Sequence, residues 1–112
     1  MDKTKFEFEI DIPENHSKHE NFINAIKELS NRLTHISENV AYIFSNGCRL
    51  LSTGHVEHTL IAKFSIIYFA NLEEMMFSAI KQNVRYIISK YDFPNKRVRV
   101  ERSRIESGEF IV

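Results

Sequence analysis

Apolar and acidic residues alternate near the start of the chain. The apolar set is Phe6, Phe8, Ile10 and Ile12, interleaved with Glu7, Glu9 and Asp11. A period of two places the two sets on opposite faces of a strand, and Pro13 cannot continue the strand pairing. The pattern therefore predicts a strand over residues 6–12 with one buried and one solvated face.

Two longer segments repeat apolar residues every three or four positions, which is the period of an amphipathic helix. The first repeat is Phe22, Ile26, Leu29, Leu33 and Ile36. It predicts a helix from about residue 18 to residue 37 with one narrow apolar face. The second repeat predicts a helix from about residue 72 to residue 91, ended by Asp92-Phe93-Pro94.

The segment between these helices is rich in β-prone residues. Asn46-Gly47 lies between two such runs, and this dipeptide is a strong hairpin signal because both residues tolerate positive φ. It predicts strands over residues 40–45 and 48–53 joined by a two-residue turn. After Gly54, residues 56–69 predict a strand that exceeds the usual length of about 5–6 residues and should bend or carry a bulge.

The last part of the chain contains one more alternating stretch. Val98 and Val100 alternate with charged residues, which predicts a strand within residues 96–105. Residues 109–112, Glu-Phe-Ile-Val, are expected to form a short edge strand or a docked tail.

The order of these elements predicts an α+β fold. Two right-handed crossovers would place both helices on one face of a mainly antiparallel sheet. This arrangement is a ferredoxin-like plait, βαββαβ with an extra hairpin strand. The length of 112 residues fits a single domain over residues 1–112. In this plait the first and last strands are expected to be central neighbours.

Composition narrows the class of protein and its location. The chain is 43% hydrophobic and 27% charged, which is ordinary for a globular domain. Its single cysteine, Cys48, cannot form an intrachain disulfide, and its first residues are charged rather than apolar, so we expect a cytoplasmic protein without a signal peptide. The longest apolar run, Ile66 to Ala70, is far shorter than the roughly 20 residues of a membrane span. No membrane association is expected.

Charge is balanced overall, with 15 basic and 15 acidic residues, but it is unevenly distributed. Residues 96–104 read Lys-Arg-Val-Arg-Val-Glu-Arg-Ser-Arg. If the first and last strands are neighbours, Arg97 and Arg99 should face the acids of the first strand and be neutralised. Arg102 and Arg104 fall beyond those acids. They are candidate phosphate-binding residues, and the basic segment could make the protein a nucleic-acid-binding module.

A second alternative is a small histidine-dependent nuclease. His55, His58 and Arg102 are its candidate residues, and His55-Val56-Glu57-His58 is also a weak candidate metal site. On a regular strand, however, residues i and i+3 point to opposite faces. The sequence therefore predicts no metal site and no cofactor.

Four residues support a family resemblance. His55, His58, Tyr86 and Lys90 resemble parts of rolling-circle replication initiators and related single-strand nucleases, which use a similar plait, a strand histidine pair and a helical tyrosine nucleophile followed by lysine. In that family one hydrophobic residue separates the histidines, whereas two residues separate them here. The sequence favours the alternative in which Tyr86 belongs to an apolar helix face and Lys90 is a solvated cation at the helix end.

The second predicted helix carries more apolar residues than one sheet can cover. Its apolar arc spans about 220°, whereas a stripe that faces one core needs little more than about 100°. Some of four side chains are therefore expected to remain at the surface or to meet another chain: Met75, Phe77, Tyr86 and Ile88. The alternative is that loops or the C-terminal residues cover them.

These observations lead to one main functional hypothesis. The sequence lacks a glycine-rich phosphate loop, and no nucleophile has a base at a characteristic spacing. We therefore expect a small non-enzymatic interaction or regulatory protein of the inhibitor, immunity or mobile-element regulator type, with a protein partner or a second copy of itself.

Overall fold

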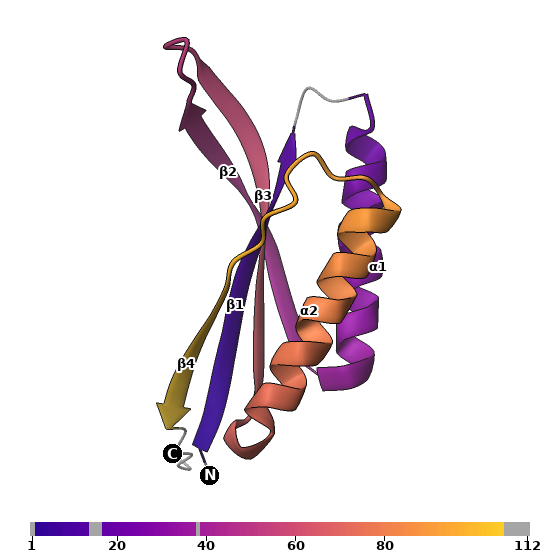
Figure 1. The fold of residues 1–112 in the computed structure, drawn as a ribbon, viewed down its shortest axis with the longest axis vertical. Helices are drawn as coiled ribbons and strands as arrows, with labels where there is room; N and C mark the ends of the chain where they lie inside the picture. Colours follow the sequence, from indigo (N-terminus) through magenta and orange to yellow (C-terminus); the bar gives the residue numbers. More distant parts are fainter. Residues whose placement is uncertain (1, 14–16, 38, 107–112) are drawn as a thin grey trace, which may run out of the picture.

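The computed structural model describes residues 2–13, 17–37 and 39–106 and shows a single antiparallel sheet with both helices on one of its faces (Figure 1). In chain order, the elements are β1 (Asp2–Pro13), α1 (His19–Ser37), β2 (Val40–Leu50), β3 (Val56–Phe69), the 3-10 turn η1 (Ala70–Leu72), α2 (Glu73–Lys90) and β4 (Val100–Glu106). The strand order in the sheet is β2-β3-β1-β4. The fold is the α+β, ferredoxin-like plait that the sequence predicts.

The prediction of an extra hairpin strand is wrong. Asn46 and Gly47 do not form a turn but lie inside β2, where they pair with Leu60 and Thr59 of β3. The turn comes later: the amide of Leu51 donates to the carbonyl of His55 over 2.8 Å. Because β3 is 14 residues long, it offers a pairing partner to every residue of β2, and continuous pairing satisfies more backbone groups than an early turn would.

Gly47 does not form a turn but allows the Ile61 side chain of β3 to approach the backbone of β2 closely. A Cβ atom at this position would lie only 2.6 Å from Cδ1 of Ile61 and 3.0 Å from Oγ1 of Thr59. The absence of a side chain therefore lets Ile61 lean across the backbone of β2. Gly54, in the observed turn, has a φ of 86°, a conformation that favours glycine.

Two other strand predictions also need correction. Of the two alternatives expected for β3, a bend or a bulge, the bulge is wrong, because β3 pairs with β1 and β2 in continuous register. β4 begins at Val100, because residues 94–99 after Pro94 are irregular. β4 is the neighbour of β1, as predicted, but it lies at the edge of the sheet. The tail predicted over residues 109–112 lies outside the described residues.

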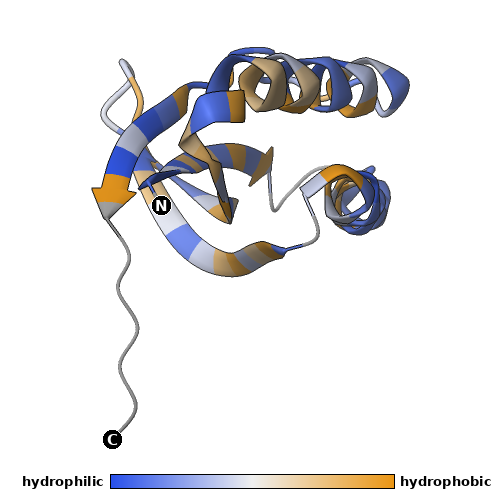
Figure 2. Cartoon of the chain, turned by 90° about the horizontal axis from the view of Figure 1, so that it is seen from below, coloured by the Kyte–Doolittle hydropathy of each residue, from blue (hydrophilic) through white to orange (hydrophobic). Residues whose placement is uncertain are grey.

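The core lies between the sheet and the two helices. Alternate residues of β1 and β3 point into it, and Figure 2 shows the resulting alternation of apolar and hydrophilic residues along the strands. Phe8 and Phe64 stack across the β1–β3 pair with ring centroids 4.8 Å apart. Of the helices in the described ranges, none combines the length and the apolarity that crossing a membrane requires.

Asp92 ends α2 in a left-handed conformation, with a φ of 51°. The amide of Phe93 donates to the carbonyl of Ile88 over 3.1 Å, and the amide of Asp92 donates to the carbonyl of Ser89 over 3.3 Å. These two bonds form a Schellman motif, which satisfies the last carbonyls of the helix. The motif turns Phe93 inward, where its ring lies 4.7 Å from that of Phe22.

Candidate functional site

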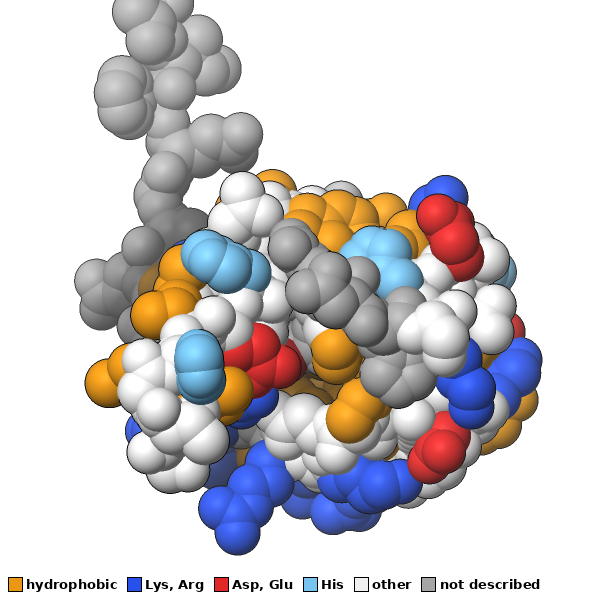
Figure 3. Space-filling model, turned by 90° about the horizontal axis from the view of Figure 1, so that it is seen from above, with side chains coloured by type: hydrophobic (Ala, Val, Ile, Leu, Met, Phe, Trp, Pro, Cys, Tyr) orange, Lys and Arg blue, Asp and Glu red, His pale blue; other side chains and the backbone are white. Residues whose placement is uncertain are grey.

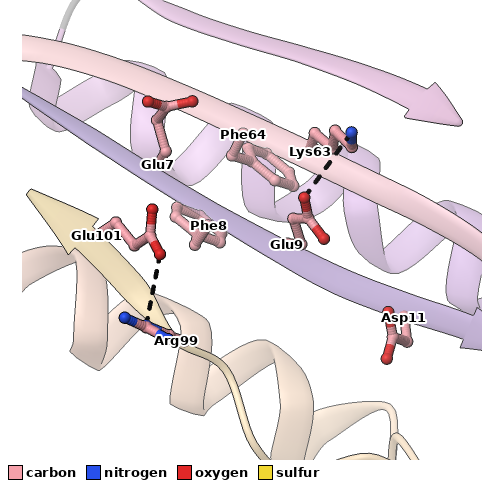
Figure 4. Close-up of a pocket in the computed structure, with 8 residues that line it drawn as sticks. All are labelled: Glu7, Phe8, Glu9, Asp11, Lys63, Phe64, Arg99 and Glu101. Carbon is pink, nitrogen blue, oxygen red and sulfur yellow. Dashed lines mark ion pairs between the residues drawn. The ribbon is translucent and has the colours of Figure 1, made fainter.

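The open face of the sheet carries a charged groove of about 440 Å³ over β3, β1 and the start of β4 (Figure 4). Its charged lining residues are Glu7, Glu9, Asp11, Lys63, Arg99 and Glu101. Nζ of Lys63 lies 3.9 Å from Oε1 of Glu9, and Nε of Arg99 lies 3.5 Å from Oε1 of Glu101. The groove is thus a solvated set of partly paired charges in which acids outnumber bases.

The predicted neutralisation of Arg97 and Arg99 by the acids of β1 is not what the structure shows. Arg99 does lie in the same groove as those acids, but its ion-pair partner is Glu101 of β4. Within the described residues, Arg97 has no ion pair, and its backbone amide donates to Oδ1 of Asn95. The prediction fails because β4 pairs with β1 only up to Val100 opposite Phe8, so both arginines precede the paired part.

Arg102 and Arg104 lie on the helix side of β4. Nη1 of Arg102 donates to Oε1 of Glu74 over 2.6 Å, and its guanidinium carbon lies 4.2 Å from the centre of the Phe77 ring. Arg102 therefore already has two partners on α2. Arg104 is exposed opposite Thr4, and the described part of the chain gives it no ion-pair partner. A phosphate-binding role for these two residues stays a prediction.

The two histidines lie at the turn end of the β2–β3 hairpin. His58 lies on β3, where its Nδ1 is 3.4 Å from Sγ of Cys48 on β2. His55 lies in the turn before β3. No group of three or more His, Cys, Asp and Glu residues in the described ranges could hold a metal ion.

Tyr86 and Lys90 face α1 instead of the histidines. The guanidinium carbon of Arg32 lies 4.1 Å from the centre of the Tyr86 ring. Nζ of Lys90 donates to Oε1 of Glu28 over 2.6 Å, and the Tyr91 hydroxyl donates to the same oxygen over 3.3 Å. The hydrogen bond from Lys90 lowers the pKa of the Glu28 carboxyl below its ordinary value, and the same bond raises the pKa of Lys90. These contacts join the two helices.

The apolar surplus of α2 is only partly exposed. Ile88 is buried in the core, and Phe77 is partly buried, with Arg102 on its ring and Nζ of Lys81 4.3 Å from the ring centre. Met75 and Tyr86 remain exposed. The expectation that some of these four side chains lie at the surface is confirmed, whereas their role in binding stays a prediction.

Most of the large apolar side chains that are exposed in the described residues lie on the β2–β3 hairpin. We call five of them the apolar arm: Ile43, Phe44, Leu50, Leu51 and Val56. Leu50 is 72% exposed and Val56, directly opposite it, is 56% exposed. Figure 1 shows the far end of this hairpin standing away from both helices, and Figure 3 shows apolar and histidine side chains close together at this end of the molecule.

The apolar arm was missed by sequence reasoning. The turn predicted at Asn46-Gly47 would have folded the segment earlier and made a further strand. The available signal was the combined length of two β-prone runs, residues 40–50 and 56–69, which exceeds what the two helices can cover.

The two edges of the sheet differ in charge. The β2 edge carries no charged residue from Val40 to Cys48, whereas β4 contains Glu101, Arg102, Arg104 and Glu106. Natural sheets usually protect an edge strand with charges, proline or a bulge, because its free backbone groups can pair with another strand. β4 has this protection, and most of β2 does not.

No protein-family model matches the chain, and no curated protein matches it. Solved structures share its fold at low identity. A phage SAM lyase in its apo state has a TM-score of 0.65 and 10% identity, over 90% of this chain and 79% of that chain. CutA1 from the psychrotrophic bacterium Shewanella sp. SIB1 has a TM-score of 0.58 and 10% identity, over 94% and 84%.

A Bacillus cereus protein related to NIF3 has a TM-score of 0.55 and 10% identity over 96% of this chain. This chain spans only 27% of that protein. At such identities the similarity establishes the class of fold, a small ferredoxin-like α+β protein, and nothing finer.

Proposed function

We propose that this protein is a small, non-enzymatic interaction protein that acts by binding another protein chain through its apolar arm. The observation that carries this proposal is the exposure of Leu50 and Val56, which lie directly opposite each other and are each more than half exposed, on a hairpin that stands away from the helices. Burying one such side chain contributes about 1.5–3 kcal/mol. Apolar side chains that gather at one surface commonly mark a protein-binding site.

The charge around the arm also favours a protein partner. Arg49 already pairs with Glu57, since its Nη2 lies 2.6 Å from the Glu57 Oε2, so the arm offers a nucleic-acid backbone little free positive charge. Inhibitors, immunity proteins and mobile-element regulators of this size provide an analogy for such a role. The cytoplasmic location stays a prediction.

Affinity capture from the source cell tests the proposal. The arm variant Leu50→Asp/Val56→Asp is compared with the native chain and with Ser52→Asp/Thr53→Asp, which adds the same charge at the exposed turn without removing apolar surface. We expect at least one protein, a second copy of this chain included, to bind the native chain and the turn variant and to bind the arm variant at least about tenfold less. Equal capture by all three would refute the role of the arm.

A second measurement addresses the non-enzymatic part of the proposal. The purified chain is incubated with RNA and with single-stranded DNA, and we expect no hydrolysis. Hydrolysis that disappears in His58→Ala would show that the protein is a nuclease, and the proposed function would then be wrong.

A further inference from the structure

β2 is an edge strand whose outer side is available for pairing. Its inner side pairs with β3 along its whole length, and in the described sheet it has no other strand neighbour. In an antiparallel pair, the backbone groups of a strand alternate between its two sides. About half of the N–H and C=O groups of β2 therefore point away from the sheet, where they can form hydrogen bonds with another strand.

We propose that β2 of one chain pairs antiparallel with β2 of a second copy, so that the two sheets join across a two-fold axis. Because this pairing uses the same hairpin as the apolar arm, it rests on the proposed function and names the partner. Because β2 carries no charge from Val40 to Cys48, it lacks the charges that discourage an edge strand from pairing. β2 of a second copy is an extended edge of the same uncharged kind, whereas the edge strand β4 carries charges.

Symmetry fixes the register of the proposed pairing. A two-fold axis that relates adjacent antiparallel strands runs perpendicular to the sheet, so it keeps both helix layers on the same side. Pairing over all 11 residues of β2 then places the axis at Ser45, the midpoint of Val40–Leu50. Ser45 faces Ser45 of the second copy, and each residue on one side of Ser45 faces the residue equally far on the other side.

This register covers the exposed side chains of β2. Ile43, which is 62% exposed, lies opposite Gly47 of the second copy. Because Ile61 fills the space above Gly47, with Cδ1 only 2.6 Å from where a Cβ would be, Ile43 would meet an apolar side chain there. At the strand end, Leu50 lies opposite Val40, which packs against the core. Symmetry repeats each contact, so both ends of the interface are apolar.

The same register also keeps like charges apart. Arg49, the one charged residue of β2, lies opposite Ala41, and the two Arg49 side chains lie at opposite ends of the paired strands. Arg49 is already paired with Glu57 across the hairpin. The pairing therefore buries no unpaired charge, which would otherwise be costly.

Disulfide trapping tests the register. In a Cys48→Ser background, Ser45→Cys is oxidised in the full-length chain and compared with Ala41→Cys. Directly opposed residues of an antiparallel pair have Cα atoms about 4.5–5.5 Å apart, within the range of a disulfide. We expect a covalent dimer with Ser45→Cys and little with Ala41→Cys, whose partner position is Arg49. Equal cross-linking of both variants, or none, would overturn the proposed register.

Sedimentation of the native chain tests the assembly itself. We expect the mass of two chains, and we expect Ser45→Asp, which opposes two carboxylates at the axis, to weaken association by at least about tenfold. Ser103→Asp, the same change on β4, should leave association unchanged. A monomer or an assembly larger than two chains would refute the self-pairing. If a monomer still captures a different protein through the apolar arm, the proposed function stands and only the partner named here is wrong.

Discussion

The left-handed residue that ends α2 allows a quantitative test of the fold. Asp92 has a φ of 51°, a conformation that costs an L residue roughly 1–2 kcal/mol and that glycine adopts freely. Asp92 also pairs with Lys96, with Oδ1 3.2 Å from Nζ, but both side chains are largely exposed. An exposed pair of this kind contributes about 0–1 kcal/mol.

Comparing two substitutions separates these effects. Asp92→Gly and Asp92→Ala both remove the ion pair, but only glycine relieves the backbone. Glycine also gains conformational entropy in the unfolded chain, which offsets part of this relief. The lower end of the range of roughly 1–2 kcal/mol therefore applies. We therefore expect Asp92→Gly to have a free energy of unfolding about 1 kcal/mol higher than that of Asp92→Ala. Asp92→Asn keeps a side chain that tolerates this conformation, and its difference from the native chain measures the ion pair alone.

Urea unfolding at one fixed protein concentration measures these differences, since self-association would make stability depend on concentration. A difference of 1 kcal/mol corresponds to about 4 °C in Tm for a domain of this size. If Asp92→Ala is as stable as Asp92→Gly, residue 92 is not in the left-handed conformation in solution. The Schellman motif that directs Phe93 into the core would then be wrong.

Two further predictions concern the helix layer. Leu29 is fully buried, so Leu29→Ala should lower the free energy of unfolding by about 2–5 kcal/mol. Met75 is 58% exposed, so Met75→Ala should change this free energy by less than about 0.5 kcal/mol. Equal effects of the two substitutions in urea unfolding would contradict the described core. Lys90 lowers the pKa of Glu28, so the pair stabilises the protein above the ordinary carboxyl pKa, and this contribution is lost as the pH falls through the lowered value. Glu28→Gln should therefore be less stable than the native chain near pH 7, and this difference should shrink as the pH falls below the ordinary carboxyl pKa. A difference that stays constant as the pH falls would show that the ion pair is not its cause.

The sequence carried enough information for the layers of the fold but not for the hairpin. Alternation in β1 and the helical repeats of α1 and α2 depend on residues close together in the chain, and these predictions are confirmed. The Asn46-Gly47 turn failed because a dipeptide that permits a turn does not require one. What places Gly47 inside a strand is the approach of Ile61 from β3, and a local pattern cannot show that contact.

The ion-pair partners of the charged residues also depend on contacts that a local sequence pattern cannot show. That β4 would lie beside β1 was predictable from the order of elements, but the partners of its arginines were not. They depend on where pairing begins, at Val100, and on the proximity of Glu74 of α2 to Arg102. The arm became visible only with the correct turn, because the exposure of Leu50 and Val56 follows from how far the hairpin extends.

The central position of β1 affects how the chain can fold. β1 precedes the other strands in the chain, yet its two neighbours in the sheet are β3 and β4, and Asp2 pairs with Glu106. Contacts between residues so distant in sequence close large loops and slow the folding reaction. During synthesis, β1 can pair first with β3, but its other edge must wait until β4 leaves the ribosome. A chaperone that binds extended segments would therefore find this edge of β1 unpaired until β4 has been synthesised.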